Sequence, residues 1–217
     1  MVIMRKVIIF DMDGVIVDSE YTFLSSKTQM LLDRGIDTDE TYQYQFMGTT
    51  FPFMWQVMKK EFQLEDSVDD LISEMNDRRE QMIARDGIQP IKGVVAFIKK
   101  LQEKQYRLAL ASSSPKSDIL RNLAELGILD AFEVKVSGEE VKQSKPEPDI
   151  FLRAAALMDV KAEDCIVFED TKNGSRAAKS AQMTCIGFAN PDYPLQDLSA
   201  CDAIITGFSE AFNLIEQ

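Results

Sequence analysis

The sequence predicts an α/β protein with a parallel sheet in its core and an inserted helical domain, and three observations support this fold class. Short apolar runs bounded by small or acidic residues recur along the chain, as is typical of strands that are buried on both faces. From residue 107 onward these runs alternate with helical patterns, which is the arrangement of a parallel sheet covered by helices. Between the first two runs, about 100 residues pass without a strand signal, far more than one crossover helix needs.

Six apolar runs are predicted to form the strands of this Rossmann-like core. They occupy residues 6–10, 107–111, 133–136, 165–168, 184–188 and 203–205. Helices are expected at residues 93–104, 115–126, 148–158 and 173–181. In the first of these helices, Val94, Phe97, Ile98 and Leu101 recur with the spacing of one helical face.

The long interval after the first strand is predicted to be a separate helical cap domain, residues 18–86. Helices are expected at residues 19–34, 40–46, 51–62 and 68–85, and Gly35 is placed to end the first of them as a C′ glycine. The linkers are expected at residues 14–18 and 86–93, the second of which contains two glycines and a proline. The α/β core is then discontinuous and comprises residues 1–17 and 87–217.

Charge and composition exclude several function classes. The chain has 217 residues, with 24 Lys and Arg against 36 Asp and Glu and a net charge of -12, which argues against nucleic acids and anionic membranes as partners. It contains no histidine, so Ser-His-Asp and Cys-His catalysts and histidine-bound zinc are excluded.

The cysteines and the apolar runs indicate in which cellular compartment the protein is expected. Cys165, Cys185 and Cys201 are widely spaced and odd in number, which argues against a disulfide framework and a thiolate metal site. The N-terminal apolar run is too short for a signal peptide, and no run approaches the length of a membrane span. We expect a cytoplasmic monomer.

Polar side chains follow three of the predicted strands directly, and another lies in the loop after a fourth strand. They are Asp11 and Asp13 after the first strand, Ser112 and Ser113 after the second, Lys145 in the loop after the third, and Glu169 and Asp170 after the fourth. Because the carboxyl ends of parallel strands share one edge of a sheet, which is where ligands bind, these seven residues are expected to form one site.

The chemistry of this set favours Mg²⁺ and a phosphorylated substrate. Four carboxylates form an oxygen-only donor set that suits a hard cation. At about 4 Å, each like-charge pair costs on the order of 4 kcal/mol at an effective dielectric constant of 20, a cost that a divalent cation offsets. Lys145 and the hydroxyl or backbone N–H of Ser112 or Ser113 can bind phosphate oxygens. Asp11 is then placed to be the nucleophile, and Asp13 to act as acid and base.

These residues carry a resemblance to the haloacid dehalogenase superfamily, in the subgroup that has a helical cap after the first strand. The first motif is matched by residues 10–20 (FDMDGVIVDSE), and the second by residues 111–114 (ASSS). The third is matched by residues 144–149 (SKPEPD), and the fourth by residues 168–171 (FEDT) with Gly174. Order and spacing agree across essentially the whole core.

The resemblance implies a Mg²⁺-dependent phosphatase that hydrolyses a small phosphomonoester, expected to be a sugar phosphate, through an aspartyl-phosphate intermediate. Asp11 would be the nucleophile and a Mg²⁺ ligand, and Asp13 would be the acid/base, with its backbone carbonyl on the metal. The remaining roles would be phosphate binding by Ser112 and Lys145, and completion of the magnesium site by Glu169 and Asp170. Two alternatives remain, a β-phosphoglucomutase-like phosphomutase and, less favoured, a non-catalytic phospho-switch similar to a receiver domain.

The cap departs from the mutase pattern, which favours the phosphatase. Where that pattern has a histidine, an arginine and a lysine, this chain has Thr22, Phe51 and Met75. The other cap cations, Lys59, Lys60, Arg78, Arg79 and Arg85, are expected to lie on solvated faces. Thr49 and Thr50 form the tip of a cap loop and are expected to contribute to substrate specificity, while Phe53, Met54 and Trp55 are expected in the cap core.

Overall fold

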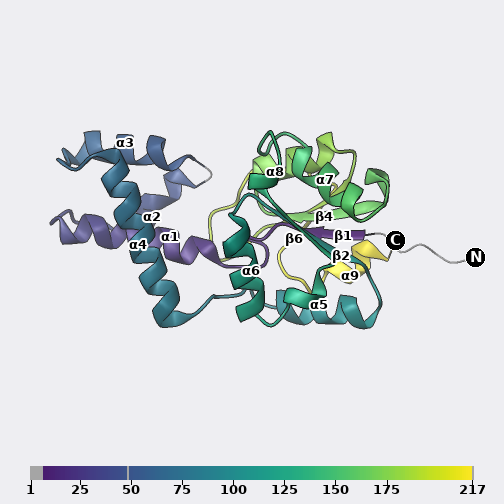
Figure 1. Ribbon diagram of the computed structural model, residues 1–217. Coiled ribbons are helices and arrows are strands. Elements are labelled where there is room, and N and C mark those ends of the chain that lie inside the picture. Colours follow the sequence, from purple (N-terminus) through teal and green to yellow (C-terminus); the bar gives the residue numbers. More distant parts are fainter. Residues whose placement is uncertain (1–6, 48, 217) are drawn as a thin grey trace, which may run out of the picture. The chain divides into compact units, whose positions relative to one another are not determined.

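The structure is a computed structural model that describes residues 7–47 and 49–216, and within these residues the core is a six-stranded sheet (Figure 1). The strand order is β3-β2-β1-β4-β5-β6, and every neighbouring pair is parallel. The strands are β1 (Val7–Phe10), β2 (Leu108–Ser112), β3 (Val134–Ser137), β4 (Cys165–Glu169), β5 (Thr184–Phe188) and β6 (Ala203–Ile205). The loops that follow β2, β1 and β4 therefore leave adjacent strands at one edge of the sheet.

The predicted strands are confirmed to within one residue at each end, apart from Lys6, which lies outside the described residues. β2, β3 and β4 each extend one residue further, to Ser112, Ser137 and Glu169, and these polar residues are at most 1% exposed. A strand whose polar last residue is fully buried is hard to recognise from hydropathy, because polarity in a sequence normally indicates the start of a loop.

Helices cover both faces of the sheet (Figure 1). α7 (Asp149–Leu157) and α8 (Lys172–Ser180) pack on the face to which Val7 and Ile9 contribute. On the other face, Phe97 of α5 (Val94–Glu103) packs edge-on against Phe10 and Phe168. The other helices of the described core are α6 (Lys116–Glu125) and the short α9 (Ala211–Ile215), which has too few residues to show a helical period.

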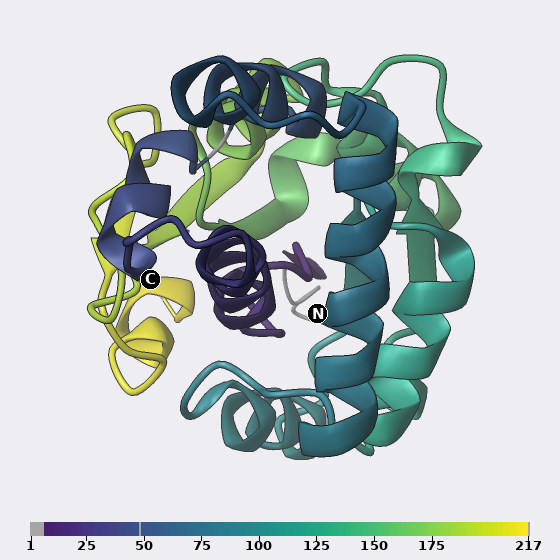
Figure 2. The ribbon, with the colours of Figure 1, turned by 90° about the vertical axis from the view of Figure 1, so that its left-hand side faces the viewer.

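The chain divides into two compact units, and the inserted unit is Ser19–Gly87. The predicted boundaries lie one residue earlier at each crossing. The inserted unit contains α1 (Ser19–Asp33), α2 (Glu40–Gln43), α3 (Phe51–Phe62) and α4 (Val68–Asp86). α4 packs against both α1 and α3 (Figure 2). Gly35 follows α1 with a φ of 77°, a left-handed conformation that glycine adopts without strain.

Two expectations for the cap are corrected. Met54 and Trp55 lie in the cap core, with 2% and 0% exposure, but Phe53 is 54% exposed because its side chain lies outside the cluster that Met54 and Trp55 join. The helix expected at residues 40–46 is divided, because α2 ends at Gln43 and a 3₁₀ turn, Tyr44–Phe46, follows it. The backbone N–H of Met47 donates to the carbonyl of Tyr44, three residues back, which is the hydrogen bond of a 3₁₀ turn.

The two linkers run side by side within the core unit. Val17 forms an antiparallel bridge with Pro90. The backbone N–H of Asp18 donates to the carbonyl of Gln89 at 2.8 Å, and that of Ile91 donates to the carbonyl of Ile16 at 2.9 Å. The chain therefore leaves and re-enters the core at neighbouring positions, so the insertion leaves the sheet intact.

Candidate active site

The strand register explains why the predicted residues converge. Phe10 of β1 is paired with Leu110 of β2 on one side and with Phe168 of β4 on the other. Asp11, the first residue after β1, is anchored by its backbone N–H, which donates to the carbonyl of Phe168 at 3.0 Å. The ends of three adjacent strands thus place Asp11 between Ser112 and Glu169.

A buried ammonium joins two of the acids. Lys145 Nζ lies 2.5 Å from Asp11 Oδ1 and 2.8 Å from Glu169 Oε1, and all three side chains are at most 9% exposed. Nζ also lies 4.9 Å from the centre of the Phe151 ring. Ion pairs that are removed from water in this way are held in one geometry, since each charge needs its partners.

Burial disfavours the charged forms of both Asp11 and Lys145, but the net pKa of each group also depends on its neighbours. Burial raises the pKa of Asp11 to about 7, and the negative charges of Glu169 and Asp13 add to the rise, although Lys145 opposes it. Burial on its own would lower the pKa of Lys145, but the adjacent carboxylates of Asp11 and Glu169 outweigh burial and raise it. Lys145 therefore remains an ammonium at neutral pH.

Glu169 is fixed by the start of the helix that follows it. Its Oε2 accepts hydrogen bonds from the backbone N–H groups of Asp170 and Thr171, both at 2.8 Å, and from Thr171 Oγ1 at 2.9 Å. Gly174 permits this close approach, since a Cβ at that position would lie 1.5 Å from Glu169 Oε1. Thr171 was not among the predicted site residues, although it stands in the fourth motif directly after Asp170.

Asp13 faces the serine loop after β2. Its Oδ2 accepts hydrogen bonds from Ser114 Oγ at 2.6 Å and from Ser112 Oγ at 3.4 Å. Ser112 is fully buried, whereas Ser113 is exposed. Ser114 was absent from the predicted site, although it belongs to the same run of three serines. The sequence could not distinguish Ser113 from Ser114, because the direction of each side chain depends on how the loop turns.

Asp170 packs against the loop after β1. A Cβ on Gly14 would lie 2.0 Å from Asp170 Oδ2, and Gly14 has a φ of 78°. Both the conformation and the space therefore require glycine at this position. This contact brings the end of the fourth motif against the first.

The donor set fits a hard cation in its chemistry, but the acids are not arranged as a ready-made cage. Every candidate ligand is an oxygen, as Mg²⁺ prefers. Within residues 7–47 and 49–216, no three acidic or thiol side chains are grouped closely enough to hold a metal ion. Lys145 lies between Asp11 and Glu169, and hydrogen bonds engage both oxygens of Glu169. Asp11 and Asp170 are therefore the acids best suited to hold Mg²⁺, with Glu169 supporting them, and the backbone carbonyl of Asp13 stays a predicted ligand.

The predicted specificity residues Thr49 and Thr50 are exposed in the cap unit, on the loop that leads into α3. Thr49 Oγ1 donates to the carbonyl of Phe46 at 2.7 Å, and Thr50 is the N-cap residue of α3. Their contribution to specificity stays a prediction.

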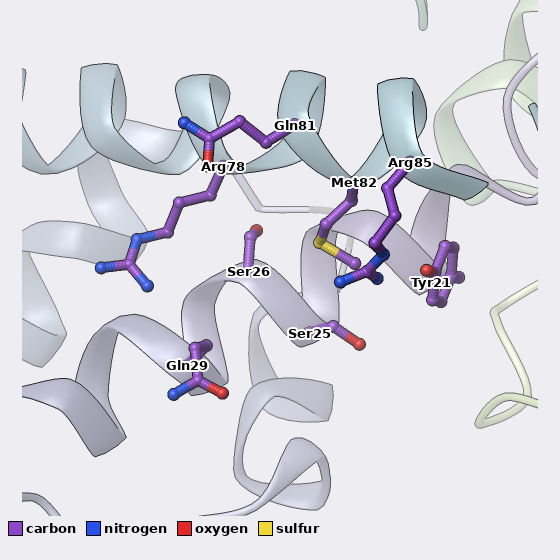
Figure 3. Close-up of a pocket in the computed structure, with 8 residues that line it drawn as sticks. All are labelled: Tyr21, Ser25, Ser26, Gln29, Arg78, Gln81, Met82 and Arg85. Carbon is purple, nitrogen blue, oxygen red and sulfur yellow. The ribbon is translucent and has the colours of Figure 1, made fainter. Parts of the chain in front are cut away.

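The cap also contains a cavity of about 460 Å³ between α1 and α4 (Figure 3). Its two guanidinium groups are already held by carboxylates. Arg78 pairs with Asp33 at 2.7 Å and Glu74 at 2.6 Å, and Arg85 pairs with Asp86 at 2.6 Å. Arg78 is therefore part of an ion-pair network and not a simple solvated residue, whereas Arg85, with a side chain that is 69% exposed, lies on a solvated face as expected.

Lys59 and Lys27 complete the account of the cap cations. Lys59 Nζ donates to the backbone carbonyls of Leu64 at 3.0 Å and Glu65 at 3.1 Å, so it closes the end of α3 rather than facing solvent. Lys27, which was not considered from the sequence, is only 5% exposed. Its pKa is lowered to about 8, chiefly by burial; Glu20 opposes this change, and Arg79 adds to it.

None of the helices in the described part of the chain combines the length and the apolar character needed to cross a bilayer.

Comparisons with known proteins agree with this geometry. Residues 8–188 match the family model of the haloacid dehalogenase-like hydrolases. A phosphorylated carbohydrates phosphatase from Thermotoga maritima is 29% identical over 176 residues, which cover 81% of each chain. A beta-phosphoglucomutase from Bacillus subtilis is 32% identical, covering 84% of this chain and 82% of its own.

A crystal structure from Thermotoga maritima, provisionally named a beta-phosphoglucomutase, superposes with a TM-score of 0.82 at 27% identity. It covers 98% of this chain and 99% of its own. The family match extends from β1 to β5, through every strand end that carries a candidate site residue. This chain therefore belongs to the haloacid dehalogenase-like hydrolases.

Proposed function

We propose that this protein is a Mg²⁺-dependent phosphatase that hydrolyses a small phosphomonoester of the sugar-phosphate class through an aspartyl-phosphate. The observation that carries the proposal is the buried Asp11–Lys145–Glu169 cluster, flanked by Asp13 and its serines, at the ends of three adjacent strands. The relative that is named a phosphorylated carbohydrates phosphatase supports the choice of substrate class.

Each side chain has a role that its position allows. A carboxylate oxygen of Asp11 attacks phosphorus, and the bond from phosphorus to the ester oxygen breaks. Asp13 gives a proton to the leaving alkoxide and later takes one from the water that cleaves the aspartyl-phosphate. Lys145 and the hydroxyl of Ser112 bind the non-bridging oxygens, on which negative charge is concentrated. Asp11 and Asp170 would hold Mg²⁺, which would supply positive charge next to the phosphoryl group.

A metabolite screen tests the proposal. Purified protein with Mg²⁺ is incubated with a panel of phosphorylated sugars, nucleotides and acids, and released phosphate is measured. We expect phosphate release from sugar phosphates, and a decrease in kcat/KM of at least ~10³-fold in Asp11→Asn. Asp130→Asn, the same substitution at an exposed position of the core unit, should change kcat/KM little. Normal turnover by Asp11→Asn, with wild-type circular dichroism, would refute the assignment of the nucleophile.

A phosphomutase is the second candidate, favoured by the 32% identity to the Bacillus subtilis enzyme. It would need a second cationic phosphate site, yet Arg78, Arg85 and Lys59 are engaged by carboxylates or carbonyls of the cap. Incubation with glucose 1-phosphate and a bisphosphate activator separates the two functions. A mutase forms the isomer without free phosphate, and a phosphatase releases phosphate.

A phospho-switch of the receiver type is disfavoured by the helical insertion, α1 to α4, directly after the strand that carries Asp11. The lifetime of the acyl-phosphate provides the test. Catalysis requires turnover within seconds, and signalling would require persistence for much longer.

A further inference from the structure

Two cysteines that lie far apart in the sequence meet in the fold. Cys185 of β5 and Cys201, in the turn before β6, are 16 residues apart, and their sulfur atoms lie 3.5 Å from each other. Both are free thiols in this structure. The third cysteine, Cys165, is fully buried at the start of β4, and its thiol lies 3.5 Å from the carbonyl oxygen of Lys161.

The backbone holds the two thiols in this proximity. The N–H of Asp202 donates to the carbonyl of Cys185 at 2.8 Å, and the N–H of Cys185 donates to Asp202 Oδ2 at 2.8 Å. Lys179 pairs with the same carboxylate at 2.7 Å. Asp202 is thus bound to β5 through both its backbone and its side chain, which keeps its neighbour Cys201 against the strand.

Gly187 makes room for the second sulfur. A Cβ at Gly187 would lie 2.9 Å from Cys201 Sγ, closer than atoms of this kind approach. Gly187 is also the register partner of Glu169 in β4. The thiol pair therefore occupies a space built one strand away from the acidic end of β4.

The two thiols differ in access and in acidity. Cys185 has no exposed surface, whereas Cys201 is partly exposed. The thiol of Cys185 can donate a hydrogen bond to the sulfur of Cys201, which lowers the pKa of Cys201. Cys201 is thus the sulfur that an oxidant from solution meets first, and the thiolate is the form that reacts.

We propose that Cys185 and Cys201 form a reversible redox-modification site whose co-reactant is a hydroperoxide. The Cys201 thiolate attacks the peroxide oxygen, the O–O bond breaks, and hydroxide (or an alkoxide) leaves, so that Cys201 becomes a sulfenic acid. The sulfur of Cys185 then attacks that of Cys201, the S–O bond breaks, and water leaves as the disulfide forms. Two thiols are oxidised, and the peroxide is reduced. Closing the bond to its usual ~2.05 Å needs an approach of about 1.5 Å.

Thiol mapping tests this site independently of any phosphatase activity. Reduced full-length protein is treated with equimolar hydrogen peroxide, then denatured in N-ethylmaleimide, digested and analysed by mass spectrometry. Of the three thiols, we expect one to remain alkylatable, with a peptide that joins Cys185 to Cys201 and a mass decrease of about 2 Da before alkylation. Dithiothreitol should restore all three thiols.

Three variants sharpen the test. Cys165→Ser is the matched control and should form the same disulfide. In Cys185→Ser, the sulfenic acid of Cys201 should persist and be trapped by dimedone, and in Cys201→Ser neither product should form. Three alkylatable thiols in peroxide-treated wild type, or a disulfide that includes Cys165 or joins two chains, would overturn the proposal. Because these outcomes are read on the wild type, they decide it even where a variant fails to fold.

Discussion

At the scale of single residues, the site depends on charges that are taken out of water. Asp11, Lys145 and Glu169 are almost fully buried and satisfy one another through contacts of 2.5 and 2.8 Å. In water such contacts contribute little, but in a buried site each charge depends on its partners. The pKa of Asp11, raised by burial to about 7, is the measurable consequence.

This raised pKa predicts a pH dependence of Mg²⁺ binding. Since the usual value for an aspartate is 3.8, the native protein holds a proton on Asp11 between about pH 4 and 7 that the unfolded chain has lost. The stability that this proton provides disappears as the pH rises through 7, and below that pH Mg²⁺ must displace it. We expect the Kd for Mg²⁺ to be about tenfold weaker at pH 6 than at pH 8.

Isothermal titration at the two pH values measures this dependence. In Asp11→Asn, which has no proton to displace, the dependence should vanish. Equal affinities of the wild type at pH 6 and pH 8 would contradict the raised pKa.

At the scale of elements, the start of α8 shows how a helix positions a side chain. Glu169 ends β4, and the turn into α8 surrounds its carboxylate with N–H and O–H donors. Gly174 lies in the first turn of that helix, where alanine would normally stabilise a helix by about 1 kcal/mol. Contact with Glu169 should reverse this preference.

Gly174→Ala is therefore expected to lower kcat at least tenfold and to weaken Mg²⁺ binding. The added Cβ would lie 1.5 Å from Glu169 Oε1, so the carboxylate must leave its position beside Lys145. The matched control is Gly207→Ala, where the nearest atom to a new Cβ is 3.8 Å away. Steady-state kinetics and melting temperatures of both variants provide the comparison, and equal effects would show that Gly174 has no particular importance.

The cap helix α1 carries a buried cation, which gives a second prediction at this scale. Lys27 has a folded-state pKa of about 8 against a usual 10.5, since burial disfavours its charge. The unfolded chain therefore binds more protons than the native state between pH 8 and 10.5, and the free energy of unfolding rises with pH in that window. In Lys27→Met this rise should disappear, and the variant should gain on the order of 3 kcal/mol at pH 7.

Urea unfolding from pH 7 to 10 measures the effect, with Lys60→Met, an exposed lysine of α3, as the control. Only the difference between the Lys27 and Lys60 variants reports on burial. A Lys27→Met protein that is less stable than the wild type at pH 7 would show that the ammonium has a favourable role in the cap.

At the scale of the whole molecule, each of the two compact units has buried apolar clusters of its own within the described residues. The sheet core includes Val7, Ile9 and Val167, and the cap has its own cluster around Met30, Trp55 and Leu71. Each unit thus buries apolar surface without drawing on the other cluster. A chain that is built in this way need not unfold in a single step.

Calorimetry should therefore resolve two thermal transitions. Mg²⁺ should raise only the transition of the core unit, which contains the acids, and Lys27→Met should raise only that of the cap. A single transition with equal calorimetric and van't Hoff enthalpies, shifted by both changes, would show that the units unfold together.

Much of this architecture could be predicted from the sequence, because the relevant signals are local. An apolar run such as residues 184–188, or the helical spacing within residues 51–62, is complete within one segment, and both match the structure. The polar residues at strand ends and in the following loops are local in the same way, so the sequence predicts that Asp11, Ser112, Lys145 and Glu169 gather at one edge of the sheet. Two predictions were wrong, an unbroken helix at residues 40–46 and a buried Phe53, because both features depend on what packs against the segment.

The sequence by itself thus determined the fold class, the helical insertion and most, but not all, of the polar residues at the acidic edge of the sheet. Only the tertiary structure decided that Lys145 joins Asp11 to Glu169, that Ser114 bonds Asp13, and that Cys185 meets Cys201. The reason is physical. Secondary structure follows from the side chains within a few residues, whereas these contacts depend on which strands are neighbours and on the path of each loop, and atoms far apart along the chain set both.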